Sequence, residues 1–277
     1  MTTAQDALRD AVQRLRAAGV NDPARDARVL LAHALGISRD RLTLVMPDDM
    51  PDTALDRFNK AITAREARQP VAQITGRRAF FGRDFIVTPD VLDPRPETEL
   101  LVEAALSRPG DRVLDLGTGS GCILLSVLAE RASATGLGVD ASKAALDVAR
   151  RNATALGVAD RATFQSGDWL SGITGPVDLI LSNPPYVTEA EMAALSPEVA
   201  NWEPAEALTP GGDGLAAYRT ICADAPNVLA PQGWLIVEIG SGQADLVAGL
   251  FGQAGFQKIE VKQDLAGHNR VVLGQLG

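Results

Sequence analysis

The sequence predicts an α/β fold: a Rossmann-like, mostly parallel sheet with an antiparallel edge strand, preceded by a small all-α domain and a β-hairpin linker. Three observations support this prediction. Helical spacing of apolar residues fills roughly the first 70 positions, and strand-like and helix-like segments alternate from about residue 98. The end of the chain, 256–277, has the pattern of two strands with no helix between them. Alternation of this kind is typical of a doubly wound parallel sheet.

The first domain, residues 1–70, is expected to be a helical bundle. The segment 4–19 places its apolar residues on one helical face and ends at a glycine. A second helix is expected to begin at Asp22-Pro23 and to end at Gly36, and a third fills 52–69, before Pro70. Residues 71–92 carry two strand-like runs around Gly82-Arg83, which predicts a hairpin linker with its turn at that dipeptide.

The second domain, residues 93–277, is expected to hold the sheet. Its predicted strands are Arg112–Leu116, Gly136–Asp140, Ala162–Gln165, Val177–Ser182 and Trp234–Ile239. Predicted helices between them include Lys143–Leu156 and Leu215–Val228.

Charge and composition narrow the class of protein. The chain has a net charge of 26 − 35 = -9; residues 1–80 contribute 13 − 10 = +3 and residues 81–277 contribute 13 − 25 = -12. This balance argues against a general nucleic-acid coat. Cys122 and Cys222 predict neither a disulfide framework nor a metal site. No apolar run is long enough to span a membrane, and the N-terminus lacks a signal-type apolar core, so a cytoplasmic location is expected.

A glycine loop follows the strand at 112–116. Gly117, Gly119 and Gly121 allow a tight turn and close approach to a ligand. Asp140 ends the next strand, where a carboxylate can accept hydrogen bonds from ribose hydroxyls. A nicotinamide-dependent enzyme shares these features, but its fingerprint is G-x-G-x-x-G, whereas this loop is G-x-G-x-G. Asp115 suits a cationic amino group better than a pyrophosphate. The pattern D-x-G-x-G-x-G with a later acid is that of S-adenosylmethionine methyltransferases.

Other cofactor contacts are expected beside this loop. Thr118 and Ser120 lie within it. After the third strand, Asp168 could meet an adenine amino group and Trp169 could cover the ring, although the same pair is as often a cap plus a core aromatic.

The stretch Asn183-Pro184-Pro185-Tyr186 ends the fourth strand. An amide or aryl-amine nitrogen is a poor nucleophile because its lone pair is delocalised. The Asn183 side-chain oxygen and the Pro184 carbonyl could hold both of its N–H bonds, the prolines would make the pair rigid, and Tyr186 could stack on the acceptor. These four residues are the predicted catalytic and substrate-binding group, with Asn183 also bordering the cofactor.

The tetrad also occurs in DNA adenine methyltransferases, so it leaves the substrate open. The sequence of 74–103, together with "NWEPAEAL" at 201–208, "GGDGLAAYR" after it and "VEIGSGQ" at 237–243, resembles the HemK/PrmC family. The resemblance implies a class I S-adenosylmethionine-dependent methyltransferase that methylates the glutamine of the Gly-Gly-Gln motif in class I peptide chain release factors. It also implies that the N-terminal domain recognises the substrate. One departure is Asp93, where the family usually has an apolar residue.

Two other functions stay open on sequence alone. A nucleic-acid adenine N6-methyltransferase would need a basic surface, while the domain with the tetrad is acidic. A non-catalytic fold that only binds a release factor or the ribosome would not need the intact loop and Asn183. We expect a monomer that requires neither nucleic acid nor a membrane. Arg95, Glu97 and Thr98 are weaker candidates for lining the site.

Overall fold

The computed structural model describes residues 2–277, which form two compact units. The first unit is the chain up to Arg77 together with Ser196–Trp202. The second unit is Arg78–Leu195 together with Glu203–Gly277. The sequence contains no local signal that Ser196–Trp202 returns to the helical unit, and we call these seven residues the strap.

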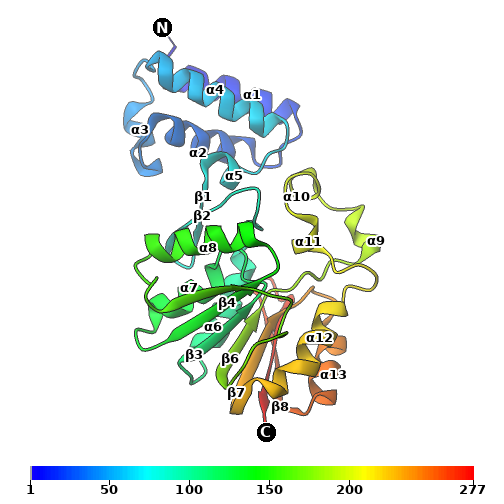
Figure 1. Ribbon diagram of the computed structural model, residues 1–277. Coiled ribbons are helices and arrows are strands. Elements are labelled where there is room, and N and C mark those ends of the chain that lie inside the picture. The colour runs from blue at the N-terminus through cyan, green and yellow to red at the C-terminus, as the bar shows by residue number, and fades with distance from the viewer. Residues whose placement is uncertain (1) are drawn as a thin grey trace. The chain divides into compact units, whose positions relative to one another are not determined.

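The first unit is helical, as predicted; its part up to Arg77 is drawn in blue to cyan in Figure 1, and α10 in yellow-green. The carboxylate of Asp22 accepts a hydrogen bond from the Arg25 backbone N–H, Pro23 opens the helix, and Gly36 ends it with φ of 68°. Buried alanines and leucines with Phe58 and Ile62 form its core. Its helices are α1 (Ala4–Ala17), α2 (Pro23–Leu35), η1 (Arg39–Arg41), α3 (Leu42–Val45), α4 (Asp52–Glu66), α5 (Val71–Thr75) and α10 (Pro197–Ala200).

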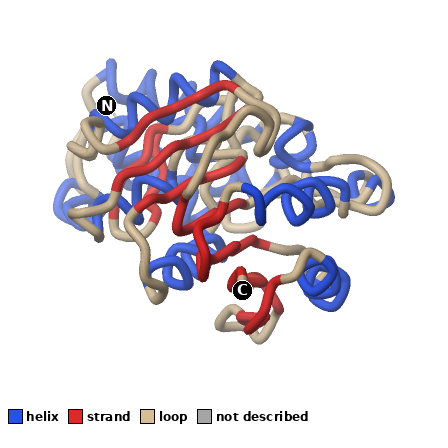
Figure 2. The backbone as a smooth tube through the Cα atoms, turned by 60° about the horizontal axis from the view of Figure 1, so that its bottom comes forward, coloured by secondary structure: helices blue, strands red, loops and turns tan. Residues whose placement is uncertain are grey.

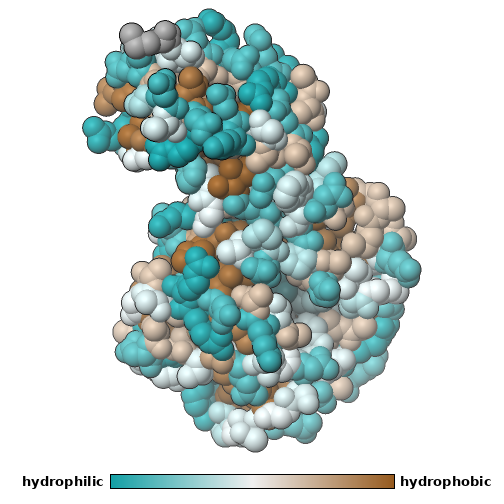
Figure 3. All heavy atoms as spheres, turned by 45° about the horizontal axis from the view of Figure 1, so that its top comes forward, coloured by the Kyte–Doolittle hydropathy of each residue, from teal (hydrophilic) through white to brown (hydrophobic). Residues whose placement is uncertain are grey.

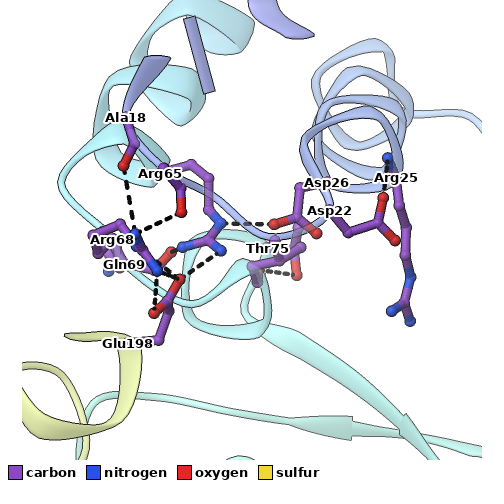
Figure 4. Close-up of polar contacts among 11 residues, drawn as sticks. Ala18, Asp22, Arg25, Asp26, Arg65, Arg68, Gln69, Thr75 and Glu198 are labelled. Atoms are coloured by element: carbon purple, nitrogen blue, oxygen red, sulfur yellow. Dashed lines mark hydrogen bonds and ion pairs between the residues drawn. The ribbon is translucent and has the colours of Figure 1, made fainter. Parts of the chain in front are cut away.

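Ion pairs hold the strap within the helical unit (Figure 4). Glu198 accepts hydrogen bonds from Arg68 at 2.8 Å and from Arg65 at 2.9 Å. Arg65 also donates to Asp26 at 2.7 Å, and the Trp202 indole donates to a backbone carbonyl of the same unit. Burial works to raise the pKa of Glu198, but the hydrogen bonds from the two arginines outweigh it and lower the pKa to about 2.

The linker differs from the prediction in two ways. Residues 71–75 form helix α5, which ends at Gly76 in the left-handed conformation, so the first strand-like run is shorter than expected. The hairpin strands are β1 (Arg77–Phe80) and β2 (Arg83–Ile86), and the turn is Phe81-Gly82, one residue before the predicted dipeptide. Phe81 has φ of 47° and Gly82 of 71°. A two-residue turn with positive φ at both positions matches the twist of a hairpin.

A seven-stranded sheet forms the second unit, in the order β5-β4-β3-β6-β7-β9-β8. Strands β3 to β7 are parallel, and β9 lies antiparallel between β7 and β8. Two strands have the predicted bounds, whereas β7 begins at Leu229 and not at Trp234. The strands are β3 (Arg112–Leu116), β4 (Thr135–Asp140), β5 (Ala162–Ser166), β6 (Val177–Ser182), β7 (Leu229–Glu238), β8 (Phe256–Gln263) and β9 (Asn269–Leu276).

Helices cover both faces of this sheet, as Figure 2 shows. Successive strand residues point to opposite faces. Val113 and Leu179 pack with α6 and α7, and Leu114 and Ile180 pack with α12 and α13. The helical elements of this unit are η2 (Pro96–Thr98), α6 (Glu99–Leu106), α7 (Cys122–Glu130), α8 (Lys143–Ala155), α9 (Glu189–Met192), α11 (Ala205–Leu208), α12 (Ala216–Asp224), η3 (Ala225–Asn227) and α13 (Ala244–Gln253).

The surface is mixed in character. On the face seen in Figure 3, hydrophilic side chains cover most of the area and hydrophobic ones form small separate groups. Among residues 2–277, no helix has both the length and the apolar character needed to cross a bilayer.

Candidate active site

A cavity of about 470 Å³ lies at the carboxyl ends of the central strands, within the second unit. This is the edge at which open α/β sheets bind ligands. Six residues singled out from the sequence line it: Gly117, Gly119, Asp140, Trp169, Asn183 and Pro185. Residues from 90–92, 141–145 and 204–207, which sequence reasoning did not single out, complete the wall.

The glycine loop connects β3 to α7 with all three glycines at positive φ, between 55° and 80°. The Gly119 N–H donates to Asp140 at 2.8 Å, and the other oxygen of Asp140 accepts from the Ser142 N–H at 2.8 Å. Asp140 therefore does more than face the cavity: its carboxylate fixes the loop. At Gly121, a Cβ would stand 2.9 Å from the Leu125 side chain, so the loop packs tightly on its own helix.

Asn152, a residue that sequence reasoning missed, supports the loop from α8. Its side chain is fully buried and donates to the Ser120 carbonyl at 2.9 Å. It also exchanges two hydrogen bonds with the Ile86 backbone, at 2.7 and 3.1 Å. A buried amide satisfied in this way rigidifies its surroundings. Asn152 thus ties the end of the hairpin to the glycine loop, a contact between distant segments that local sequence patterns do not reveal.

Asp115 is fully buried beneath the loop and does not line the cavity. Thr118 donates to one of its oxygens at 2.6 Å, whereas Asp115 Oδ1 has no hydrogen-bond partner among residues 2–277. Burial raises the pKa of this carboxyl to about 7, although the Thr118 hydroxyl works in the opposite direction. A buried carboxylate oxygen without a donor is suited to a cationic partner.

Trp169 and Asp168 differ in position. Trp169 has φ of 48°, which is uncommon for a bulky residue, and its ring edge is 3.7 Å from where a Gly117 Cβ would stand. Backbone strain of this kind occurs at ligand sites. Asp168 is exposed and does not line the cavity.

The tetrad follows β6, whose last residue is fixed by a hydrogen bond from the Ser182 hydroxyl to the Leu116 carbonyl at 2.8 Å. Asn183 Nδ2 donates to the Thr98 hydroxyl at 3.3 Å. Neither Asn183 Oδ1 nor the Pro184 carbonyl accepts a hydrogen bond from the described residues, 2–277. Both oxygens are therefore available as acceptors. Pro185 lines the cavity, while Pro184 and Tyr186 do not appear in its wall.

Tyr186 is directed toward a buried glutamate. Its hydroxyl donates to Glu238 Oε1 at 3.3 Å, at the end of β7. Burial raises the pKa of Tyr186 well above its normal range, and the neighbouring Glu238 charge adds to this effect. Thr98 and Glu238 each make a hydrogen bond with one residue of the tetrad. Sequence reasoning assigned Glu238 no role.

Two further carboxylates lie in the segments that resemble the family. Arg95 donates to both oxygens of buried Glu203, at 2.8 and 2.7 Å. Asp93 is also buried; its Oδ2 is 3.5 Å from an Arg78 nitrogen, and its Oδ1 has no partner among residues 2–277. Burial raises the pKa of Asp93, against the opposing charges of Arg78 and Arg95. The pair with Arg78 accommodates a polar residue at this position. Glu97 is exposed.

These residues fit S-adenosylmethionine. The glycines at positive φ allow close approach of a ligand to the backbone. The Asp140 carboxylate faces the cavity at the end of β4, the Trp169 ring lies beside the loop, and Asp115 retains an oxygen without a donor. Asp140 and Trp169 thus have chemistry suited to the ribose and the adenine, and the unpartnered oxygen of Asp115 beneath the loop suits a cationic amino group.

Fold and site together define a class I S-adenosylmethionine-dependent methyltransferase. In agreement, residues 90–216 match the "Methyltransferase small domain" and residues 6–76 match the "PrmC N-terminal domain". A crystal structure of a methyltransferase from Pyrococcus furiosus has the same fold, with a TM-score of 0.55 and 16% identity over 79% of this chain and 98% of that one.

Comparison with curated relatives identifies the family within this class of methyltransferases. It is 57% identical to the release factor glutamine methyltransferase of Cereibacter sphaeroides over 273 residues, covering 99% of this chain and 98% of the relative. It is 49% identical to the protein of the same name from Rhodospirillum rubrum, over 95% of this chain and 82% of that one. The chain belongs to the release factor glutamine methyltransferase family.

Proposed function

We propose that this protein transfers a methyl group from S-adenosylmethionine to the side-chain amide nitrogen of a glutamine in peptide chain release factors, the one in the Gly-Gly-Gln motif. The names of the relatives support the substrate. The observation that carries the chemistry is the orientation of Asn183: its NH2 group is bonded to Thr98, which leaves its oxygen free at the wall of the cavity.

The proposed binding of the cofactor uses the glycine loop, with Asp140 as acceptor for ribose hydroxyls and Trp169 against the adenine ring. When bound, S-adenosylmethionine supplies an electrophilic methyl group on a sulfonium. Asp115 would neutralise the amino group through its unpartnered oxygen. Thr118 supports that role by holding the other oxygen of Asp115.

On the acceptor side, Asn183 Oδ1 and the Pro184 carbonyl would each accept one N–H of the glutamine amide. Holding both N–H bonds turns the nitrogen lone pair out of conjugation and fixes its direction, which is catalysis by positioning. Pro184 and Pro185 restrict the backbone between the two acceptors. The methylated amide is strongly acidic, so it loses its proton to a carbonyl oxygen or water without a dedicated base.

The helical unit is proposed to recognise the protein substrate. It has its own core and contributes none of the residues that line the cavity. Contacts remote from the reacting group can supply orientation. We expect hydrogen exchange of the full chain to slow in the helical unit when a release factor is added. The cytoplasmic location and the monomeric state are expectations from the sequence.

Mass spectrometry tests the proposed function. A release factor incubated with the protein and S-adenosylmethionine should gain one methyl group, and fragmentation should place it on the glutamine side chain. Asn183→Ala, compared in parallel, should give little product. A methyl group on another residue, or on a nucleic acid in place of the release factor, would contradict the proposal.

A further inference from the structure

Three segments of the second unit are joined into a closed ring of hydrogen bonds. They are residues 95–98 with η2, residues 183–187 with the tetrad, and residues 203–209 with α11. From this ring, Asn183, Pro185, Pro204 and Ala207 line the cavity. The ring therefore connects separate parts of the cavity wall.

The first side of the ring runs from the tetrad to Arg95. Asn183 Nδ2 donates to the Thr98 hydroxyl at 3.3 Å. The Thr98 N–H donates to the Arg95 carbonyl at 3.1 Å, which closes the single turn of η2. The carboxamide of Asn183 is therefore connected to Arg95 through one short turn.

The second side of the ring runs from the tetrad to Glu203. Val187 directly follows the tetrad, and its N–H donates to the Leu208 carbonyl at 3.0 Å. The Thr209 hydroxyl donates to the Val187 carbonyl at 2.6 Å. Residues 205–208 form α11, which leads from this contact back to Glu203. The end of α11 is therefore tied to the backbone that follows the tetrad.

An ion pair between Arg95 and Glu203 closes the ring. Arg95 Nη2 donates to both oxygens of Glu203, at 2.8 and 2.7 Å. The Glu203 side chain is 1% exposed, whereas that of Arg95 is 33% exposed. Breaking a buried ion pair by removing one partner is strongly unfavourable, because the other charge stays buried without compensation. Without Arg95, Glu203 and the start of α11 would therefore shift toward water.

We propose that Arg95 and Glu203 are positioning residues for methyl transfer, because their ion pair fixes α11 relative to the tetrad. This inference rests on the proposed function, in which the Asn183 oxygen and the Pro184 carbonyl hold the glutamine amide. Neither Arg95 nor Glu203 lines the cavity, so each acts through the ring. Catalysis by positioning is sensitive to such a change, because a misplacement of about 1 Å can cost roughly a hundredfold in rate.

Single-turnover methylation of a release factor by the full chain, at saturating cofactor, tests the proposal. Arg95→Met keeps an apolar stem but removes the charge and the donors, and its rate should fall by roughly ten- to a hundredfold. Affinity for S-adenosylmethionine should stay within a few-fold, because the glycine loop has its own hydrogen bonds to Asp140. Arg95→Lys, which keeps a charged donor, should retain more of the rate. A folded Arg95→Met protein with the original rate would overturn the proposal.

A double variant, Arg95→Met/Glu203→Leu, keeps the test decisive if Arg95→Met does not fold. Replacing both partners by apolar side chains leaves no unpaired charge in the interior, so it costs less stability than removing one. The rate of the double variant should equal that of Glu203→Leu, because the two residues act as one link. An original rate in the double variant, or losses that multiply in it, would overturn the proposal.

Arg219→Met is the matched control. Arg219 also donates to both oxygens of a carboxylate, that of Asp213, but this pair is exposed and lies outside the ring. The same substitution should therefore leave the transfer rate unchanged. A loss equal to that of Arg95→Met would contradict a specific role for the ring.

Hydrogen exchange separates this inference from the proposed function. The Val187 amide lies across the ring from the ion pair, and its hydrogen bond to Leu208 should open more often when the ring is cut. Its exchange should be several-fold faster in Arg95→Met than in the original protein and unchanged in Arg219→Met. That result would support the ring even if release factors proved not to be the substrate. Equal exchange at Val187 in all three proteins would overturn the inference.

Discussion

The two halves of the cavity are held in different ways. The cofactor half consists of the glycine loop 117–121 with Asp140 and Asn152. Asp140 binds two backbone N–H groups at 2.8 Å, and Asn152 makes three hydrogen bonds to backbone atoms of Ile86 and Ser120. The hydrogen bonds that hold this half are 2.7 to 3.1 Å long, and each joins a side chain to the backbone.

The acceptor half consists of Asn183–Tyr186 with Thr98 and Glu238. Two of its hydrogen bonds, from Asn183 to Thr98 and from Tyr186 to Glu238, are 3.3 Å long and join side chains to side chains, while Gln243 donates to the Tyr186 carbonyl at 3.1 Å. One oxygen of Glu238 has no donor among residues 2–277. In this half, Asn183 and Tyr186 are therefore each bonded to a different side chain, and the partner of Tyr186 is a buried titratable group.

The difference teaches that binding and transfer are separable in this site. The cofactor half is built rigidly before any ligand arrives, as a general nucleoside site requires. In the acceptor half, the orientation of one carboxamide decides whether a glutamine N–H meets an acceptor or another donor. Changes in the first half should affect affinity, and changes in the second should affect the rate of transfer.

The largest effect should come from Asn183→Asp. This change retains an acceptor oxygen but removes the donor to Thr98 and adds a negative charge at the wall of the cavity. Loss of a positioned hydrogen-bonding group typically costs about 2.7–4 kcal/mol, or roughly 10²–10³ in rate. Single-turnover assays at saturating cofactor measure it. A rate within a few-fold of the original would mean that the neutral carboxamide is not needed.

A smaller effect, on stability, is expected for Asn152→Leu. The change leaves the Ile86 N–H and the Ser120 carbonyl without partners inside the protein. Unsatisfied buried groups of this kind cost about 1–3 kcal/mol each. We expect a loss of about 3 kcal/mol in the free energy of unfolding by urea, together with weaker cofactor binding and a nearly normal rate at saturation. Thr154→Ala, an exposed position on the same helix, is the control. Equal stabilities for the two variants would remove Asn152 as an anchor.

The smallest effect, on the stability of the helical unit, is expected for a substitution in the strap. Its chain continues directly into 203–208, where Pro204, Glu206 and Ala207 line the cavity. Glu198→Gln should destabilise the helical unit by about 1–2 kcal/mol at pH 7, because the hydrogen bonds that Arg65 and Arg68 donate would then end on a neutral amide in place of a carboxylate.

The pH dependence of that loss has a definite sign. The pKa of Glu198 is lowered from 4.5 to about 2, so its contribution is complete above pH 4.5 and is lost as the pH falls toward 2. Unfolding measured over this range should show the two proteins converge at low pH. Asp10→Asn, at an exposed position in the same unit, should change little. Parallel curves at all pH values would contradict the role of Glu198.

Much of the fold was predictable because its signals are local. The bounds of β3 and β6, the glycine loop and the tetrad each follow from a short run of residues. Thr98 contacts Asn183, and Glu238 contacts Tyr186, only because η2, β6 and β7 end near the same edge of the sheet. A single glutamate at a strand end has no distinguishing pattern. The strap was equally hidden, because its packing depends on arginines 130 residues away in sequence. The turn at Phe81 was misplaced by one residue because a phenylalanine at positive φ is uncommon.

The most direct test measures cofactor affinity and transfer rate side by side in Asp140→Ala and Asn183→Ala. Asp140→Ala should weaken S-adenosylmethionine binding by about 1.5–3 kcal/mol by calorimetry, and it should transfer at a near-normal rate once saturated. Asn183→Ala should bind the cofactor within a few-fold of the original affinity and lose roughly 10²–10³ in single-turnover rate on a release factor. If both variants lose the same property, or if folded Asn183→Ala transfers at the original rate, the division between the two halves is wrong.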